Sequence, residues 1–155
     1  MTAILAIDPG THLSAWLLLV DGRPTAFAKE ANEELVAKLR GELALAPDPD
    51  VLVIEEITSY GTRPIGRETF TTMRWAGRFE EAMRRVPAVY LPRGTVARRL
   101  GARGDSGVRA ALIDHFGGET AIGRKASPGP LYGIAADVWS ALAVAVTYRP
   151  KEDMP

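Results

Sequence analysis

Residues 2–10 read Thr-Ala-Ile-Leu-Ala-Ile-Asp-Pro-Gly, an apolar run that ends in an acidic residue and a Pro-Gly pair. The run is typical of a buried β-strand, and Pro9-Gly10 predicts a turn directly after it. A second apolar run, Leu13–Val20, predicts the next strand. Asp21-Gly22 then predicts a hairpin turn into a third strand over Pro24–Lys29.

Beyond these three strands, helical and strand patterns alternate along the rest of the chain. Asn32 is placed to cap a helix that runs to about Ala46, where Pro47 and Pro49 end it. The order of elements predicts an α/β fold with antiparallel and parallel pairing, in a single domain over residues 1–155. The remaining expected elements are a strand over Val51–Glu55, a helix over Arg67–Arg85, a strand over Ala88–Leu91, helices over Thr95–Leu100 and Ser106–Phe116, a loop over Gly117–Gly133 and a last helix over Ala135–Tyr148.

Composition excludes several kinds of site. The 155 residues include no cysteine and two histidines, which excludes a disulfide scaffold, a zinc ribbon, a thiol nucleophile and a His-rich metal site. A metal ion would have to bind oxygen ligands, which points to Mg²⁺ or Mn²⁺. No apolar run reaches the ~20 residues that span a bilayer, and the N-terminus lacks the basic start of a signal peptide. We therefore expect no membrane contact and a cytoplasmic location.

Charge is distributed unevenly along a chain whose formal net charge is zero. Residues 63–109 carry 11 arginines, no lysine and 4 acidic side chains, whereas residues 1–62 carry 4 basic and 10 acidic ones. Arginine suits bidentate binding of phosphate better than lysine does, so the middle segment is a candidate surface for nucleic acid. The alternative is a solvated helix face with its own ion pairs, and charge alone does not separate the two.

Three acidic residues stand at the ends of predicted elements. Asp8 ends the first strand, Glu55 ends the fourth and Asp137 opens the last helix. If the two strands are parallel neighbours, their ends lie about 5 Å apart, and a divalent cation would relieve the repulsion between two carboxylates there. Taken singly, Asp8 fits a turn before Pro-Gly, and Asp137 fits a charge at a helix N-terminus. Taken together, the three favour a metal site.

Several motifs, spread over the whole chain, form a recognisable set. They are Ile4–Gly10 with Ser14-Ala-Trp16, Val51–Glu55, Ser59-Tyr60-Gly61, Gly66–Phe70, Trp75–Phe79, Arg109–Asp114, Pro128–Gly133, and Ala135-Ala-Asp137 with Ala141–Ala145. The set resembles RuvC-type Holliday-junction resolvases, and most of all the RuvC-like proteins that bacteriophages encode. The resemblance implies a ribonuclease H-like fold, with a five-stranded mixed sheet and helices on both faces. It also implies a homodimer that nicks branched DNA, such as four-way junctions, with Mg²⁺ or Mn²⁺.

The resemblance further implies that Asp8, Glu55 and Asp137 are catalytic residues that hold two metal ions. RuvC-type enzymes have two acidic positions, or an acid and a histidine, three residues apart on the last helix. Here the positions three residues either side of Asp137 are Ile134 and Ser140. Either Ser140 stands at the fourth metal position, holding a water molecule, or the second ion is bound more weakly.

Other candidate residues lie near these acids in the sequence or in the arginine-rich segment. Glu55 rather than Glu56 is assigned to the site, because neighbours in a strand face opposite sides and the spacing to Ser59-Tyr60-Gly61 favours Glu55. Lys125 is a candidate for reaching the scissile phosphate, with a solvated lysine as the alternative. Tyr60 could stack on an unpaired base, or simply pack at the edge of the core. The arginines expected to neutralise DNA phosphates are Arg67, Arg74, Arg78, Arg93, Arg98, Arg99 and Arg103.

Three other functions were weighed. The missing fourth acid leaves open a catalytically weak or silent protein that binds branched DNA. A nuclease that processes ribosomal RNA has the same fold, although the arginine-rich segment favours DNA. An actin-like kinase or ATPase needs a second domain, and the chain has no Gly-x-x-x-x-Gly-Lys loop, so we expect no nucleotide cofactor.

Overall fold

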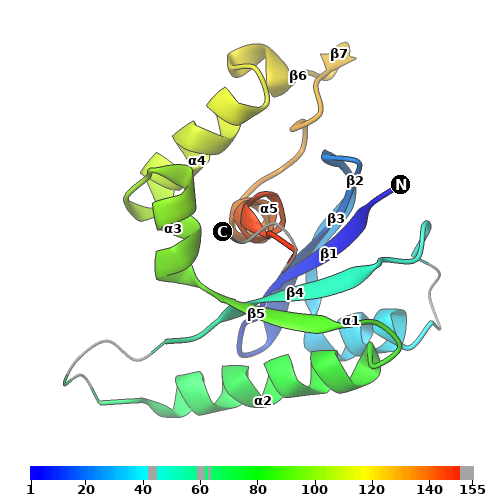
Figure 1. Ribbon diagram of the computed structural model, residues 1–155, viewed down its shortest axis with the longest axis vertical. Coiled ribbons are helices and arrows are strands. Elements are labelled where there is room, and N and C mark those ends of the chain that lie inside the picture. The colour runs from blue at the N-terminus through cyan, green and yellow to red at the C-terminus, as the bar shows by residue number, and fades with distance from the viewer. Residues whose placement is uncertain (42–44, 59–61, 63, 151–155) are drawn as a thin grey trace.

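A five-stranded sheet with the order β3-β2-β1-β4-β5 forms the centre of the computed structural model, which describes residues 1–41, 45–58, 62 and 64–150 (Figure 1). Its strands are β1 (Ala3–Asp8), β2 (Leu13–Val20), β3 (Arg23–Ala31), β4 (Val51–Glu56) and β5 (Ala88–Pro92). β2 pairs with β1 and with β3 in antiparallel fashion, whereas β4 pairs with β1 and with β5 in parallel. The predicted mixed sheet is confirmed.

Helices cover both faces of this sheet (Figure 1). One face carries α1 (Asn32–Leu39) and α2 (Arg67–Ala82), and the other carries α3 (Arg93–Leu100), α4 (Gly104–His115) and α5 (Val138–Thr147). Alternate strand residues supply the two cores, so that Leu5 and Ile7 pack with α1 and α2 whereas Ala6 packs with α5. Eight of the ten residues of α5 are buried, which explains its almost continuous apolar sequence.

The start and end of α1 differ from the prediction. The helix ends at Leu39 rather than near Ala46, because Gly41 adopts a left-handed conformation with φ of 88°. Residues 42–44 of the predicted helix lie outside the described residues. Asn32 does not cap α1, since Ala31 occupies the N-cap position and the Asn32 side chain bonds to Gly10 instead.

Later helices also shift by a few residues. α2 ends at Ala82 rather than Arg85. α3 begins at Arg93 and α4 at Gly104, each two residues earlier than expected, and α5 begins at Val138 rather than Ala135. The expected loop over 117–133 contains a short helix, η1 (Glu119–Ala121), and a two-stranded hairpin of β6 (Gly123–Arg124) and β7 (Ser127–Pro128). Among the helices of the described residues, none has both the length and the apolar character to cross a membrane.

Candidate functional site

Asp8 and Glu55 stand side by side at the carboxyl ends of β1 and β4. The parallel register pairs Ile7 with Ile54, so the two acids follow on adjacent strands, about 5 Å apart across the sheet. Both side chains point to the face that α5 covers, since each lies two residues beyond a member of that core. Glu55 is buried, whereas Glu56 is exposed. The backbone therefore brings one carboxyl group from each strand into one small space.

Burial and the neighbouring acids make Asp8 difficult to ionise. Desolvation, a hydrogen bond with Glu55 and the charges of Glu55 and Asp137 raise the pKa of Asp8 to about 8, against an opposing effect of Arg93. A hydrogen bond between two carboxyl groups requires a proton on one of them. At neutral pH the pair therefore holds a proton in the position where a divalent cation would satisfy both groups.

Arg93 provides a positive charge at Glu55. It is the first residue of α3, directly after β5, and its Nε donates to Oε1 of Glu55 over 2.8 Å. The Arg93 side chain is 57% exposed, whereas that of Glu55 is 10% exposed. Arg93 therefore contacts the buried carboxyl group while part of its own side chain stays at the surface. The charge of Glu55 in turn raises the pKa of Arg93 above its ordinary value.

A cavity of about 260 Å³ opens beside these groups and is lined by Asp8, Glu55, Arg93 and Thr58, among others. The buried Thr58 Oγ1 finds no hydrogen-bond partner within the described part of the chain, an arrangement that normally costs free energy. Two carboxyl groups and an unpartnered hydroxyl make an all-oxygen donor set. That set fits a hydrated Mg²⁺ or Mn²⁺ ion.

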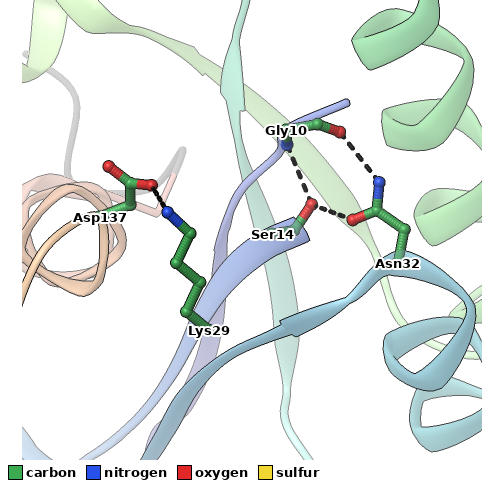
Figure 2. A network of polar contacts seen from close by, with 5 residues as sticks. All are labelled: Gly10, Ser14, Lys29, Asn32 and Asp137. Atoms are coloured by element: carbon green, nitrogen blue, oxygen red, sulfur yellow. Dashed lines mark hydrogen bonds and ion pairs between the residues drawn. The ribbon is translucent and has the colours of Figure 1, made fainter. Parts of the chain in front are cut away.

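The turn after Asp8 is fixed by a network of hydrogen bonds (Figure 2). The Gly10 amide donates to Ser14 Oγ over 3.0 Å, the Ser14 hydroxyl donates to Asn32 Oδ1 over 2.6 Å, and Asn32 Nδ2 donates to the Gly10 carbonyl over 3.0 Å. Ser14 and Asn32 are almost fully buried. A Cβ atom on residue 10 would lie 2.1 Å from the Leu13 carbonyl oxygen, so this close approach requires glycine. The network holds the turn, and with it Asp8, in one position.

Asp137 approaches the site from the start of α5. It occupies the N-cap position and follows Ala136, whose φ of 46° is a costly left-handed conformation for a residue with a Cβ atom. Its carboxylate pairs with Lys29 of β3, with Nζ and Oδ2 2.5 Å apart (Figure 2). Its charge acts on Asp8, but the described residues contain no group of three His, Cys, Asp or Glu side chains that could share a metal ion.

Ser140 lies one turn after Asp137 and borders a cleft of about 700 Å³ between α4 and α5. Arg93 and Arg109 also line this cleft. The guanidinium carbon of Arg109 lies 5.1 Å from the centre of the Trp139 ring, which favours a fixed position for this charge. The cleft therefore extends from Asp137 to a surface that carries two arginines.

The arrangement of strands and helices around these acids also occurs in a known architecture. The structure of T. thermophilus RuvC in complex with a Holliday junction substrate matches with a TM-score of 0.71 and 16% identity, over 95% of this chain and 92% of that chain. The fold is that of RuvC. A second structure, of Thermus thermophilus RuvC, matches with a TM-score of 0.64 and 17% identity, over 94% of this chain and 92% of that one.

The likeness to RuvC confirms the predicted ribonuclease H-like architecture. Neither a protein-family model nor a curated protein matches the sequence. At 16% and 17% identity, the likeness concerns the fold. The closer relation to phage-encoded proteins stays a prediction, because both solved structures are of T. thermophilus RuvC.

Within the RuvC fold of this chain, the predicted DNA-binding arginines differ in their surroundings. Arg67 and Arg74 are exposed on α2, which begins on the side of the molecule where β4 ends (Figure 1). Arg78 makes two hydrogen bonds to Glu33, of 3.1 and 3.2 Å, and lies over the ring of Trp75. Arg78 is therefore held by Glu33 and Trp75, whereas Arg67 and Arg74 are exposed.

The arginines after β5 also divide into two kinds. Arg98 and Arg103 are exposed on α3 and just before α4. Arg99 instead donates to the carbonyl oxygen of Thr147 over 2.8 Å. Thr147 ends α5, about 15 Å along the helix axis from Asp137. Arg99 therefore holds α3 against α5 at a point remote from the acids.

Lys125 is not brought to the acids in the structure. Lys125 is exposed in the turn between β6 and β7. The base of that hairpin, at Pro128, shares a cleft with the β2–β3 turn at Asp21-Gly22, which is the end of the sheet opposite to Asp8. Tyr60 lies outside the described residues.

Proposed function

We propose that this protein is an endonuclease that cuts four-way junctions and other branched DNA with Mg²⁺, for which Mn²⁺ can substitute. The observation that carries the proposal is the carboxyl pair of half-buried Asp8 and buried Glu55, which lines a cavity with Thr58. The charge of Asp137 also acts on Asp8. The likeness in fold to RuvC bound to a Holliday junction substrate supports the choice of DNA substrate.

In this proposal Asp8, Glu55 and Asp137 hold the metal, and Ser140 orients a water molecule. A divalent ion held there would activate the attacking water and stabilise the leaving oxygen of the phosphodiester. Its charge would favour the ionised form of Asp8. Arg93 orients the Glu55 carboxyl group through the 2.8 Å hydrogen bond, and its exposed end is available to a DNA phosphate.

The DNA arms would contact the exposed arginines of α2, Arg67 and Arg74, and those near α3, Arg98 and Arg103. A homodimer would supply one site for each of two strands at a junction. The apolar surface available for a second copy is on α2, where Phe70 and Met73 are each 52% exposed. An exposed pair of large apolar side chains on one helix is typical of a contact surface.

The test is one gel with three substrates: a four-way junction, a linear duplex of the same sequence and a structured RNA, each with and without Mg²⁺. We expect nicking of the junction alone, and only with Mg²⁺ or Mn²⁺. Cleavage of RNA in preference to the junction would favour the ribosomal-RNA nuclease instead. Asp8→Asn should abolish nicking and keep or tighten junction binding, because it removes a metal ligand without adding negative charge near the phosphates.

A catalytically silent protein that binds branched DNA is the second candidate. Two observations favour it: Ser140 stands where RuvC-type enzymes were expected to have an acid, and Lys29 already pairs with Asp137. On the same gel, a silent binder would retard the junction without nicking it in either Mg²⁺ or Mn²⁺.

A further inference from the structure

Four residues lie in a row across the sheet: Lys29 on β3, Ala15 on β2, Asp8 on β1 and Glu55 on β4. Lys29 pairs with Ala15 and Ala15 with Asp8, while Glu55 directly follows the last pair of the β1–β4 register. Ala15 belongs to the core beneath α5, so strand alternation puts all four side chains on that face. The small Ala15 side chain leaves space for Lys29 to extend toward the start of α5.

A cation stands at each end of this row. Lys29 contacts Asp137 over 2.5 Å and Arg93 contacts Glu55 over 2.8 Å, with Asp8 between the two pairs. The charge of Asp105, in the first turn of α4, also acts on Arg93. Arg109 lines the same cleft as Asp105 and Asp137, so four ionised carboxyl groups and three cations leave one negative charge. One divalent ion brings the total to one positive charge, whereas a second would bring it to three in a partly buried site.

We propose that Lys29 takes the place of one of the two divalent ions expected from the resemblance, so that this protein binds a single divalent ion at Asp8 and Glu55. The inference rests on the proposed nuclease function. It adds Lys29 to that site and sets the number of divalent ions bound there at one. In this arrangement Asp137, assigned above to the metal together with Asp8 and Glu55, pairs with the Lys29 ammonium instead, and Lys29 provides the positive charge on that side of the row.

The distribution of oxygen donors supports one ion rather than two. At the Asp137 end, Ser140 offers a neutral hydroxyl, and Asp137 and Asp105 line a cleft that also holds the cations Arg93 and Arg109. At the other end, Asp8, Glu55 and Thr58 line a common cavity of about 260 Å³. The donors that suit a hard cation are therefore concentrated at Asp8 and Glu55.

Stability of the fold does not account for a lysine at this position. The side chains of Lys29 and Asp137 are 37% and 53% exposed. Ion pairs of this exposure contribute little to the stability of a fold, because solvent screens them and the side chains lose freedom when they pair. The main consequence of Lys29 is therefore the charge that it places beside the candidate metal ligands.

Mn²⁺ binding tests the inference without any nuclease reaction. Free Mn²⁺ would be followed by electron paramagnetic resonance during titration of the intact protein at pH 8, with thermal unfolding to verify that each variant is folded. We expect one bound ion per chain for the wild type and for Lys29→Arg, which keeps the charge. Lys29→Met should bind a second ion, or bind the first at least about fivefold more tightly, because Asp137 loses its cation.

Lys38→Met is the matched control. Lys38 also pairs with a carboxylate, Glu30, over 2.7 Å, but on the opposite face of the sheet beside Trp16. This variant should bind one ion with the affinity of the wild type. Two ions bound by the wild type, or a Lys29→Met variant with one ion and an affinity within about fivefold of the wild type, would overturn the inference.

Failure of the nuclease proposal itself gives a different result. If Asp8→Asn binds Mn²⁺ as well as the wild type does, the Asp8–Glu55 pair is not a metal site, and both proposals are lost. If the wild type binds two ions and nicks the junction, the nuclease proposal stands and only the role of Lys29 is lost.

Discussion

Nε of Arg93 lies 2.8 Å from Oε1 of Glu55, a contact that joins the first residue of α3 to the carboxyl end of β4. Arg93→Met leaves a buried carboxyl group beside Asp8 without its cation. We expect the free energy of unfolding to fall by about 1–3 kcal/mol at pH 8, less than for a fully buried pair because Arg93 is partly exposed. The loss should be smaller at pH 5, where a proton replaces the missing cation. Urea unfolding at both pH values measures this.

Arg84→Met is the control for Arg93. Its pair with Glu81, at 3.4 Å, is exposed on both sides, so its removal should change stability by less than about 0.5 kcal/mol. Equal losses of stability for the two variants at both pH values would show that Arg93 stabilises the fold no more than an exposed ion pair does.

The raised pKa of Asp8 predicts how stability depends on pH without metal. In the folded protein this pKa is about 8, against an ordinary value of 3.8. The folded state therefore keeps a proton that the unfolded chain releases. The stability that Asp8 contributes is complete below about pH 4 and is lost as pH rises toward 8, with a slope of at most about 1.4 kcal/mol per pH unit.

Asp8→Asn removes this titration. Urea unfolding should be measured from pH 5 to pH 9. We expect the free energy of unfolding of Asp8→Asn to increase relative to that of the wild type as pH rises. Asp114→Asn, on the exposed side of α4, should follow the wild type throughout. A pH-independent difference for Asp8→Asn would mean that Asp8 does not hold a proton in the folded state.

Binding of a divalent ion should offset the loss of stability at high pH. An ion that binds only the folded state stabilises it by about 1.4 kcal/mol when its concentration is ten times the dissociation constant. We expect Mg²⁺ at pH 8 to raise the Tm of the wild type but not of Asp8→Asn, and to raise that of Thr58→Val by less than in the wild type. NaCl at equal ionic strength is the control, and the same Tm shift with NaCl would exclude a specific site.

The network of Gly10, Ser14 and Asn32 should be cooperative. Asn32→Ala removes the acceptor of the buried Ser14 hydroxyl hydrogen and the donor to the Gly10 carbonyl, so we expect a loss of about 1–3 kcal/mol in the free energy of unfolding. Because both variants disrupt one network, Ser14→Ala combined with Asn32→Ala should cost clearly less than the sum of the two single changes. Additive losses measured by urea unfolding would contradict a shared network.

Salt dependence should separate the arginines that contact DNA from those that hold the fold. Arg67→Ala and Arg74→Ala should each lower the slope of log K against log [salt] for junction binding by about 1. Arg99→Ala should leave that slope unchanged and lower stability instead, because Arg99 bonds to the Thr147 carbonyl. Arg23→Ala, at the opposite end of the sheet, is the control for binding. An unchanged slope for Arg67→Ala and Arg74→Ala would leave these two as surface charge.

The sequence by itself determined the sheet and the position of its two central acids. The apolar runs that end at Asp8 and Glu55 are long enough and uniform enough to be buried strands, and both acids lie at strand ends in the structure. Strand alternation showed only that Glu55 and Glu56 face opposite sides, and the choice of Glu55 came from the family resemblance, through its spacing to Ser59-Tyr60-Gly61. The strands and their alternation follow from short-range periodicity, which a sequence displays directly.

The surroundings of these acids were decided by tertiary structure alone. A register shift between Leu18 and Leu19 places Lys29 opposite Ala15, whereas an unbroken hairpin from Val20 and Arg23 would have placed Ala28 there. Because side chains in a strand alternate, a shift of one residue changes the face on which Lys29 lies. Lys29 thereby reaches Asp137, which is 108 residues away in the sequence, and no local pattern encodes a contact of that range.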